Sequence, residues 1–235
     1  MKLRLLSASL LALTLAAGSA FAQTTPPPDR NALSYALGYD LGRNLIESGE
    51  SIDLATVTRA LQDGYAKKDP AVPVEQLRTA FQTMEKRQQE KAEAAFNKLA
   101  TENRAKSTAF LNQNKAKAGV QTLPSGVQYR VIEAGTGAKP NQASTVTLQY
   151  RGALTDGRVF ADTYSPPAGQ AAPAPTPMKV SEIPLQGLRE ALVLMPAGSR
   201  WEVVMPANTA YGNTRQSPIG PEQAVVYDIK LLTVQ

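Results

Sequence analysis

The chain has 235 residues, of which 43% are hydrophobic and 19% charged, an ordinary globular composition that allows one large or two small domains. It contains no Cys and no His, which excludes disulfides, most Cys/His metal sites and His-dependent catalytic triads. The formal net charge of +5 includes Lys2 and Arg4 of a removable leader, so it is too small to indicate nucleic-acid binding.

Residues Met1–Ala22 have the pattern of a secretory signal peptide. A basic start precedes the apolar run Leu5–Ala17, and Ala20-Phe21-Ala22 fits an A-x-A cleavage site. The run is short for a membrane-spanning helix, and no Cys follows it for lipoprotein attachment. We therefore expect a cleaved signal, no membrane span afterwards, and a periplasmic or secreted protein.

A Pro-rich linker at residues 23–29 (QTTPPPD) opens the mature chain. From Arg30 to Lys68, apolar residues at helical spacing predict two short helices, the second capped by Asp53. Such short amphipathic helices make a poor core alone and need a partner surface.

Residues 73–117 have no internal Pro or Gly beyond Pro73 and predict one helix roughly 60 Å long. Its first half, with Phe81 and Met84, is apolar enough to pair with another chain. Its second half, around Thr101–Lys106, is polar and predicts a solvent-exposed stalk. We expect residues 30–118 to form a helical dimerisation domain and residues 119–235 a separate domain.

The segment from Val146 to Phe160 predicts a β-hairpin. Val146, Leu148 and Tyr150 alternate with polar residues, as in a half-buried strand. Asp156-Gly157 is a hairpin-turn signal because glycine adopts positive φ readily.

The rest of the C-terminal region predicts further strands around one short helix. Strands are expected near Val127–Val131, at Trp201–Met205 and at Ala224–Val234, and the helix at Gly187–Met195. Residues 165–177 form a low-complexity Pro/Ala loop. The expected fold class is α+β, with a bent antiparallel sheet wrapped on the helix.

Residues 119–235 resemble the FKBP-type peptidyl-prolyl cis-trans isomerase domain. The matching pieces, in the family's order, are LPSGVQYRVIEAGTG, VTLQYRGALTDGRVF, LREALVLMPAGSRWEVVMPANTAYG and PIGPEQAVVYDIKLL. Residues 30–118, with SYALGYDLGRNL and the long helix, resemble the dimerisation region of periplasmic Mip- and FkpA-like members. The resemblance implies a homodimer joined through the N-terminal helices.

The resemblance also implies a set of site residues. Tyr211 and Asp162 take the catalytic positions, although the family commonly reads Phe-Asp where this chain has Phe160-Ala161-Asp162. The remaining family positions line the substrate pocket, and they fall on Tyr150, Phe160, Ile183, Leu185, Leu188, Ile219 and Tyr227.

One family position could be taken by either of two residues, and another carries a different residue type from the family. Ile183 and Leu185 compete for the place before the short helix, and Leu188 replaces a pocket-floor tryptophan. Without the family motif, a role in the core of a small sheet would explain Tyr150, Phe160 and Tyr227 equally well. Tyr211, in a Gly-containing loop, is harder to explain as core and favours a function.

The implied activity is isomerisation of X–Pro bonds during folding of secreted or periplasmic proteins. Rotation needs an apolar pocket for a twisted amide, and no nucleophile, metal or cofactor. Implied partners are unfolded or partly folded proline-containing clients and FK506- or rapamycin-like macrolides, with no nucleic acid. Because of Ala161 and Leu188, a weakly active or inactive FKBP-fold chaperone or interaction module is the alternative. No anchoring motif supports a third class, a structural envelope protein.

Overall fold

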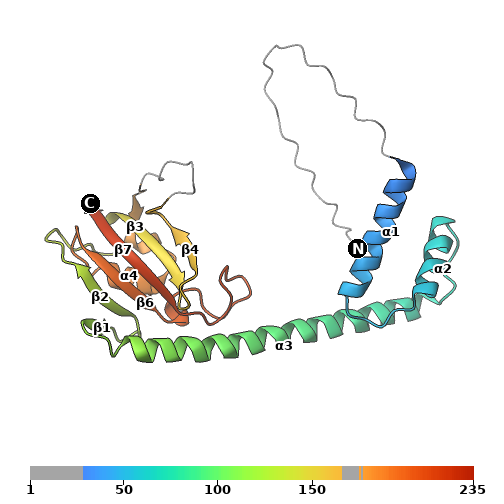
Figure 1. Ribbon diagram of the computed structural model, residues 1–235, viewed down its shortest axis with the longest axis horizontal. Helices are drawn as coiled ribbons and strands as arrows, with labels where there is room; N and C mark the ends of the chain where they lie inside the picture. Colours follow the sequence, from blue (N-terminus) through green and yellow to red (C-terminus); the bar gives the residue numbers. More distant parts are fainter. Residues whose placement is uncertain (1–28, 166–174, 176) are drawn as a thin grey trace, which may run out of the picture. The chain divides into compact units, whose positions relative to one another are not determined.

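A computed structural model describes residues 29–165, 175 and 177–235 (Figure 1). The predicted signal peptide, the linker except Asp29, and most of the Pro/Ala loop lie outside these residues. The chain divides into two compact units, Met1–Leu77 and Arg78–Gln235. The boundary lies within a helix, and each unit is described by itself.

The first unit contains two helices, α1 (Arg30–Glu47) and α2 (Leu54–Tyr65), as the sequence predicts. The Asp29 carboxylate caps α1 by accepting the N–H of Asn31. The Asp53 carboxylate caps α2 by accepting the N–H of Thr56 at 2.7 Å. Hydrogen bonding with Thr56 lowers the pKa of Asp53. Local capping therefore fixes where both helices begin.

Neither helix buries a side chain within the single chain. Large apolar residues stay exposed, including Leu37 at 65% and Ile46 at 82%. A cavity of about 550 Å³ lies along α1 and the start of α2, between Gly38 and Leu54. Such an apolar surface is typical of an interface between chains.

The long helix α3 spans Val74–Asn114, 41 residues, which confirms the predicted continuous helix. All of α3 after Leu77 belongs to the second unit, which begins at Arg78.

The prediction of a solvent-exposed stalk around Thr101–Lys106 holds for most of these residues but is wrong for one face of the helix. Ala100, Asn103 and Ser107 are buried, and so is Asn114 at the helix end. The side chains of Asn103 and Ser107 hydrogen-bond to the segment before the last strand. An apolar periodicity could not reveal this face, because polar side chains form most of it.

A seven-stranded antiparallel sheet makes up most of the second unit, with strand order β1-β2-β6-β7-β3-β4 and β5 paired to β3 (Figure 1). The strands are β1 (Val120–Thr122), β2 (Gln128–Glu133), β3 (Thr145–Leu154), β4 (Val159–Asp162), β5 (Met178–Lys179), β6 (Arg200–Met205) and β7 (Val225–Val234). The expected strands are confirmed, and β1 is an addition to them.

The predicted hairpin is formed by β3 and β4. Along β3, Val146 and Leu148 are buried while the intervening residues are not, as their alternation predicts. The turn contains Gly157 at φ 89°, a left-handed conformation that glycine adopts at little cost. A register shift between Gly152 and Ala153 marks an irregularity in the β3–β4 pairing.

One face of the sheet packs on the short helix α4 (Gln186–Leu192), which the sequence placed at Gly187–Met195. Leu188 and Leu192 of α4 join Met205 of β6 and Ile229 and Leu231 of β7 in one buried core. Two 3₁₀ turns, η1 (Val180–Glu182) and η2 (Ala207–Thr209), complete the unit. The observed fold is the expected α+β class.

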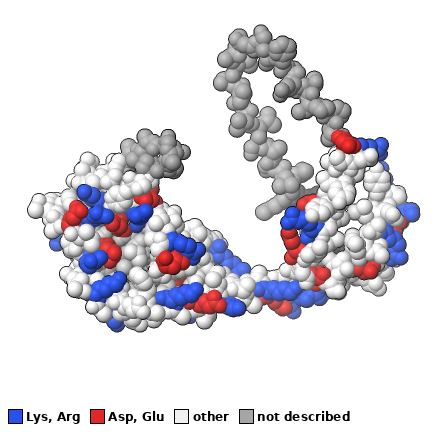
Figure 2. Space-filling model, in the orientation of Figure 1, with Lys and Arg blue, Asp and Glu red and all other residues white. Residues whose placement is uncertain are grey.

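The opposite face of the sheet carries charge. Arg200 donates to both carboxylate oxygens of Asp228, at 2.9 and 2.7 Å, and Arg130 pairs with Glu202 at 3.3 Å. On the side that Figure 2 shows, basic and acidic groups lie next to one another over this unit. The charges are thus largely neutralised in pairs, and no broad basic surface forms on this side.

Candidate active site

Four aromatic side chains from separate elements meet on the core side of the sheet, and we call them the aromatic cluster. They are Tyr150 of β3, Phe160 of β4, Tyr211 of the loop after η2, and Tyr227 of β7. Tyr227 is buried at 3% exposure, and the other three are half-buried over the core. The sheet therefore presents an aromatic surface that is accessible in part.

The rings pack at distances typical of aromatic contacts. The Phe160 ring stands edge-on to Tyr211 at 5.8 Å and to Tyr227 at 5.9 Å between centroids. Tyr150 lies 5.9 Å from Tyr227 at an interplanar angle of 36°. Offset and edge-to-face arrangements of this kind stabilise aromatic pairs and hold each ring in a defined orientation.

Gly152, between the rings, makes this packing possible. A Cβ atom there would lie 3.0 Å from atoms of both the Phe160 and the Tyr227 rings. Because Gly152 has no side chain, the two rings approach the β3 backbone closely. The sequence predicted the strand but gave no reason for a glycine at this place.

The Tyr211 and Tyr227 hydroxyls are joined by a hydrogen bond of 3.0 Å. Burial, followed by this hydrogen bond, raises the pKa of Tyr227 well above its ordinary value, so the hydroxyl stays protonated. The hydroxyl of buried Tyr227 is thereby satisfied inside the protein. The half-buried Tyr211 is left at the edge of the cluster.

The predicted aliphatic positions surround the same core. Ile183, Leu185 and Leu188 are buried, and Ile219 packs half-buried against the core. Ile183 follows η1, whereas Leu185 is the N-cap residue of α4. The Arg189 guanidinium donates to the carbonyl of Ile183, which fixes the turn between them.

Asp162 does not join Tyr211. Its carboxylate pairs with Arg151 at 3.2 Å and accepts the N–H groups of Tyr164 and Ser165 at 2.8 and 3.1 Å. Position 161, directly after Phe160, carries only the methyl group of alanine. Of the predicted site residues, the four aromatics contact one another, the four aliphatic residues lie in or against the core of the sheet unit, and Asp162 lies apart.

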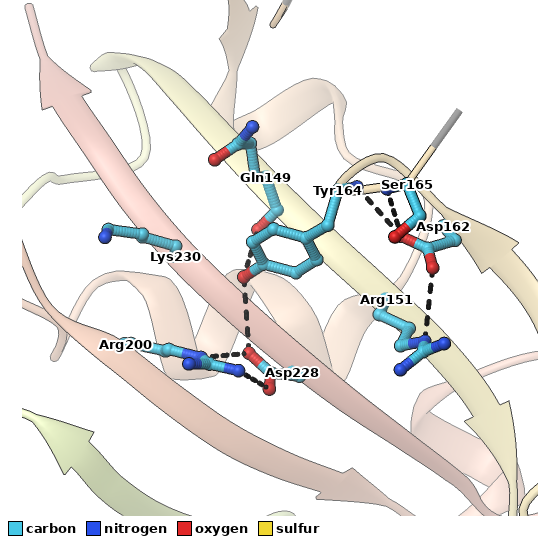
Figure 3. Close-up of a pocket in the computed structure, with 8 residues that line it drawn as sticks. All are labelled: Gln149, Arg151, Asp162, Tyr164, Ser165, Arg200, Asp228 and Lys230. Carbon is cyan, nitrogen blue, oxygen red and sulfur yellow. Dashed lines mark hydrogen bonds and ion pairs between the residues drawn. The ribbon is translucent and has the colours of Figure 1, made fainter. Parts of the chain in front are cut away.

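Asp162 lines a separate polar cavity of about 390 Å³ on the charged side of the sheet (Figure 3). The Tyr164 hydroxyl contacts the carbonyl of Gln149 at 3.4 Å and the Asp228 carboxylate at 3.2 Å. Burial and the nearby Asp228 charge raise the pKa of Tyr164. Arg151 and Arg200 are paired with the carboxylates of Asp162 and Asp228 within this cavity, and none of its lining residues belongs to the aromatic cluster.

Among the residues that the structure describes, no group of three or more His, Cys, Asp or Glu side chains could hold a metal ion. In the same part of the chain, no helix combines the length and apolarity needed to cross a membrane.

The second half of α3 holds the loop between Tyr211 and β7, and sequence reasoning missed this contribution. Asn103, Ser107 and Arg104 contact Pro221 and Glu222 of that loop. The only sequence signal was the recurrence of Asn and Ser in an otherwise charged helix. A solvent-exposed helix face has the same pattern, so this signal could not reveal the contact.

Two family models match the chain. "Domain amino terminal to FKBP-type peptidyl-prolyl isomerase" matches residues 30–131, and "FKBP-type peptidyl-prolyl cis-trans isomerase" matches residues 136–232. Together they cover most of the described residues.

Two relatives match over nearly their whole length. The chain is 40% identical to the outer membrane protein MIP of Legionella longbeachae, covering 100% of this chain and 99% of the relative. It is 34% identical to the FKBP-type 22 kDa peptidyl-prolyl cis-trans isomerase of Escherichia coli strain K12, covering 90% and 99%. The crystal structure of FkpA from Escherichia coli matches with a TM-score of 0.68 at 28% identity, covering 88% of this chain and 98% of that one.

Proposed function

Because the chain belongs to the FKBP-type peptidyl-prolyl cis-trans isomerase family and is an isomerase of that type, we propose that X–Pro bonds rotate over its aromatic cluster. The observation that carries this proposal is the meeting of Tyr150, Phe160, Tyr211 and Tyr227 on one partly accessible surface. The protein assists the folding of secreted or periplasmic proteins.

The chemistry requires stabilisation of a twisted amide. A planar X–Pro amide is separated from its isomer by roughly 20 kcal/mol, because rotation breaks the amide resonance. The twisted state has a less polar carbonyl, so an apolar aromatic surface favours it over the planar state. In this proposal the rings hold the proline, and Leu185, Leu188 and Ile219 supply apolar surroundings.

The Tyr211 hydroxyl is the proposed hydrogen-bond donor to the substrate carbonyl. Either hydroxyl could donate in the 3.0 Å contact between Tyr211 and Tyr227, and we propose that Tyr227 donates to the Tyr211 oxygen. The Tyr211 hydrogen then points away from Tyr227 and is free for the substrate, and a donor in such a chain is strengthened by its partner.

Asp162 has no catalytic role in this mechanism. Its carboxylate is bonded to Arg151 and to backbone N–H groups on the charged side of the sheet. Bond rotation needs no general base, so the loss of a carboxylate at position 161 is compatible with activity.

The substitution Tyr211→Phe tests the proposed site. It removes the donor but keeps the ring, so kcat/KM for a proline-containing peptide should fall by roughly three- to tenfold, the range for one lost hydrogen bond. Tyr164→Phe is the matched control, because its hydroxyl is also bonded to protein groups but lies in the polar cavity. Equal activity of both variants and the unchanged protein would exclude Tyr211 from the site.

The N-terminal helices support a homodimer that also binds unfolded clients. Their exposed apolar residues need a covering surface, and a second copy supplies an identical one. Two isomerase sites in one dimer would bind a long client more tightly than one. Aggregation of a client without a slow proline step tests this binding separately from isomerisation.

Further properties follow from the family resemblance and from the leader sequence. We propose cleavage of the signal peptide after Ala22, a periplasmic or secreted location, and binding of FK506-like macrolides at the aromatic cluster. The comparisons lend no support to the alternative of a weakly active or inactive FKBP-fold chaperone.

A further inference from the structure

Glu222, in the loop that follows Tyr211, has an unusual backbone conformation. Its φ is 57°, and apart from it only Lys67 among the described non-glycine residues has a positive φ. A side chain disfavours this left-handed region, so the conformation persists only where surrounding contacts impose it. The source of these contacts is α3.

The side chains of α3 hold the backbone on both sides of Glu222. Asn103 Nδ2 donates to the Pro221 carbonyl at 2.8 Å, and Ser107 Oγ donates to the Glu222 carbonyl at 2.9 Å. Ser107 Oγ also accepts the Ala224 N–H at 2.8 Å. Asn103 and Ser107 are 4% and 6% exposed, so little water competes for these bonds.

The Glu222 side chain adds a further link to the same helix. Its carboxylate pairs with the guanidinium of Arg104 at 2.8 Å. The pair is partly exposed, so its contribution is small beside the buried bonds. It nevertheless draws Glu222 toward the helix and away from solvent.

The backbone of Glu222 in turn fixes the residue after Tyr211. The Glu222 N–H donates to the Gly212 carbonyl at 3.0 Å, and the Gly212 N–H donates to the Ala207 carbonyl at 2.8 Å. The loop from Gly212 to Glu222, which carries Ile219, is therefore closed at its base. Its fixed end is the residue that α3 holds.

A second contact anchors the middle of the loop about two turns earlier on the helix. The guanidinium of Arg215 lies over the Phe96 ring at 4.8 Å, and its Nη1 lies 3.5 Å from the Ala92 carbonyl. A cation stacked on an aromatic face is attracted to it even at an exposed site. The loop thus contacts α3 at two separate places.

We infer that Asn103 and Ser107 of α3 are positioning residues of the isomerase, which hold the loop 212–224 so that Tyr211 and Ile219 keep their places. They do not touch the substrate and act through Pro221, Glu222 and Gly212. This inference rests on the proposed function of Tyr211. The long helix α3 thus helps to form the site in the sheet unit, and it also connects that unit to the N-terminal helices.

The test is the double variant Asn103→Ala/Ser107→Ala in the full mature chain. Its matched control is Asn97→Ala/Thr108→Ala, which removes the same kinds of side chain from exposed positions of the same helix. The first readout is trypsin cleavage after Arg215, which reports loop opening. It should accelerate by roughly tenfold in the test variant, as expected when buried hydrogen bonds are lost, and stay unchanged in the control.

The second readout is peptide isomerisation, with kcat and KM separated. The test variant should lose roughly fivefold or more in kcat/KM, because a displaced Tyr211 and Ile219 bind the amide in the wrong geometry. A lower melting temperature with unchanged kinetics and unchanged cleavage would overturn the inference, since the contacts would then be merely structural. Kinetics and cleavage that match those of the control would also overturn it.

A milder variant covers the case in which the double variant does not fold. Arg104→Ala removes only the partly exposed ion pair to Glu222 and should accelerate cleavage after Arg215 by roughly twofold. No acceleration in that variant would count against the inference. If the unchanged protein lacks isomerase activity, the proposed function fails, whereas the cleavage experiment still decides whether α3 holds the loop.

Discussion

The pair of hydroxyls on Tyr211 and Tyr227 is the most specific feature at the scale of single residues. A buried hydroxyl without a partner is costly, and Tyr227 has Tyr211 as its partner at 3.0 Å. This chain therefore couples its proposed donor to a second hydroxyl in the core.

The substitution Tyr227→Phe should lower kcat more than it raises KM. It keeps the ring that contacts Phe160 but frees the Tyr211 hydroxyl to rotate, so we expect roughly a threefold loss of kcat/KM. Steady-state isomerisation of a short peptide measures it. An unchanged or higher kcat would mean that Tyr227 does not orient the donor.

The two tyrosines with raised pKa values predict how stability depends on pH. The folded state binds the phenolic protons of Tyr164 and Tyr227 more tightly than the unfolded state, whose groups titrate near 10.0. Their contribution is therefore complete below about pH 10 and is lost as the pH rises through the folded-state values. The urea midpoint, followed by fluorescence of the buried Trp201, should be level from about pH 7 to 9 and fall above about pH 10.

The variant Tyr227→Phe provides the matched comparison for that pH dependence. Its urea midpoint should fall less steeply above about pH 10, because one of the protonated hydroxyls is absent. An equally steep fall in both proteins would assign the effect to other groups.

Sequence reasoning predicted which aromatic residues meet in the aromatic cluster, but not that the Asp162 carboxylate lies apart from them. Hairpin alternation places Tyr150 and Phe160 on the adjacent strands β3 and β4 because strand period and hairpin pairing are local properties. Tyr227 comes from β7, far along the chain, and only the family motif indicated that it would join them. Asp162 was grouped with Tyr211 on motif position alone. The register shift in the β3–β4 pairing and the nearby Arg151 place its carboxylate on the charged side, which no local pattern predicts.

At the scale of elements, the helices and most strands could be predicted because their signals are local. Asp53 marks the start of α2, and an uninterrupted run of helix-forming residues marks α3. The buried polar face of α3 could not be predicted. Its partners lie more than a hundred residues later in the sequence, at Pro221 and Glu222, and polar contacts leave no apolar period.

The close approach of β3 to the aromatic rings predicts that Gly152→Ala damages both stability and activity. The added Cβ would lie 3.0 Å from Phe160 and Tyr227, so the rings or the strand must shift. Overpacking of this kind costs about 1–3 kcal/mol of unfolding free energy. Urea unfolding and peptide isomerisation measure the two effects.

The control for that substitution is Gly64→Ala in α2, an exposed position outside the cavity along α1, where a Cβ meets no atom within 4 Å. It should leave isomerisation unchanged and leave stability unchanged or slightly higher, since alanine favours helix. If Gly152→Ala behaves like this control, the rings tolerate movement and their close packing is not required.

For the whole molecule, the exposed apolar residues of α1 and α2 determine the expected assembly. Leu37 at 65% and Ile46 at 82% exposure are too apolar for a surface that stays in water, and neither helix buries a residue within one chain. Dimerisation would supply the missing core.

The mature chain should therefore sediment as a dimer at micromolar concentration, and Leu37→Glu should shift it toward monomer. Placing a charge in an apolar interface costs several kcal/mol, enough to separate the chains. Isomerisation of a short peptide should remain unchanged, because it uses one site, whereas suppression of client aggregation should weaken. A monomeric unchanged protein would contradict the dimer.

The buried side chains Asn103, Ser107 and Asn114 limit the positions at which this chain can be joined to a relative in a chimera. A chimera joined at Gly119 would pair the sheet with a foreign helix, and without Ser107 and Asn114 the Ala224 N–H and the Gln128 Oε1 would lose their side-chain partners. A junction before Ala92 would keep the helix and the loop it contacts in one inherited piece. Exchange of N-terminal helices between relatives is thus compatible with the isomerase site only when the crossover falls in the first half of α3.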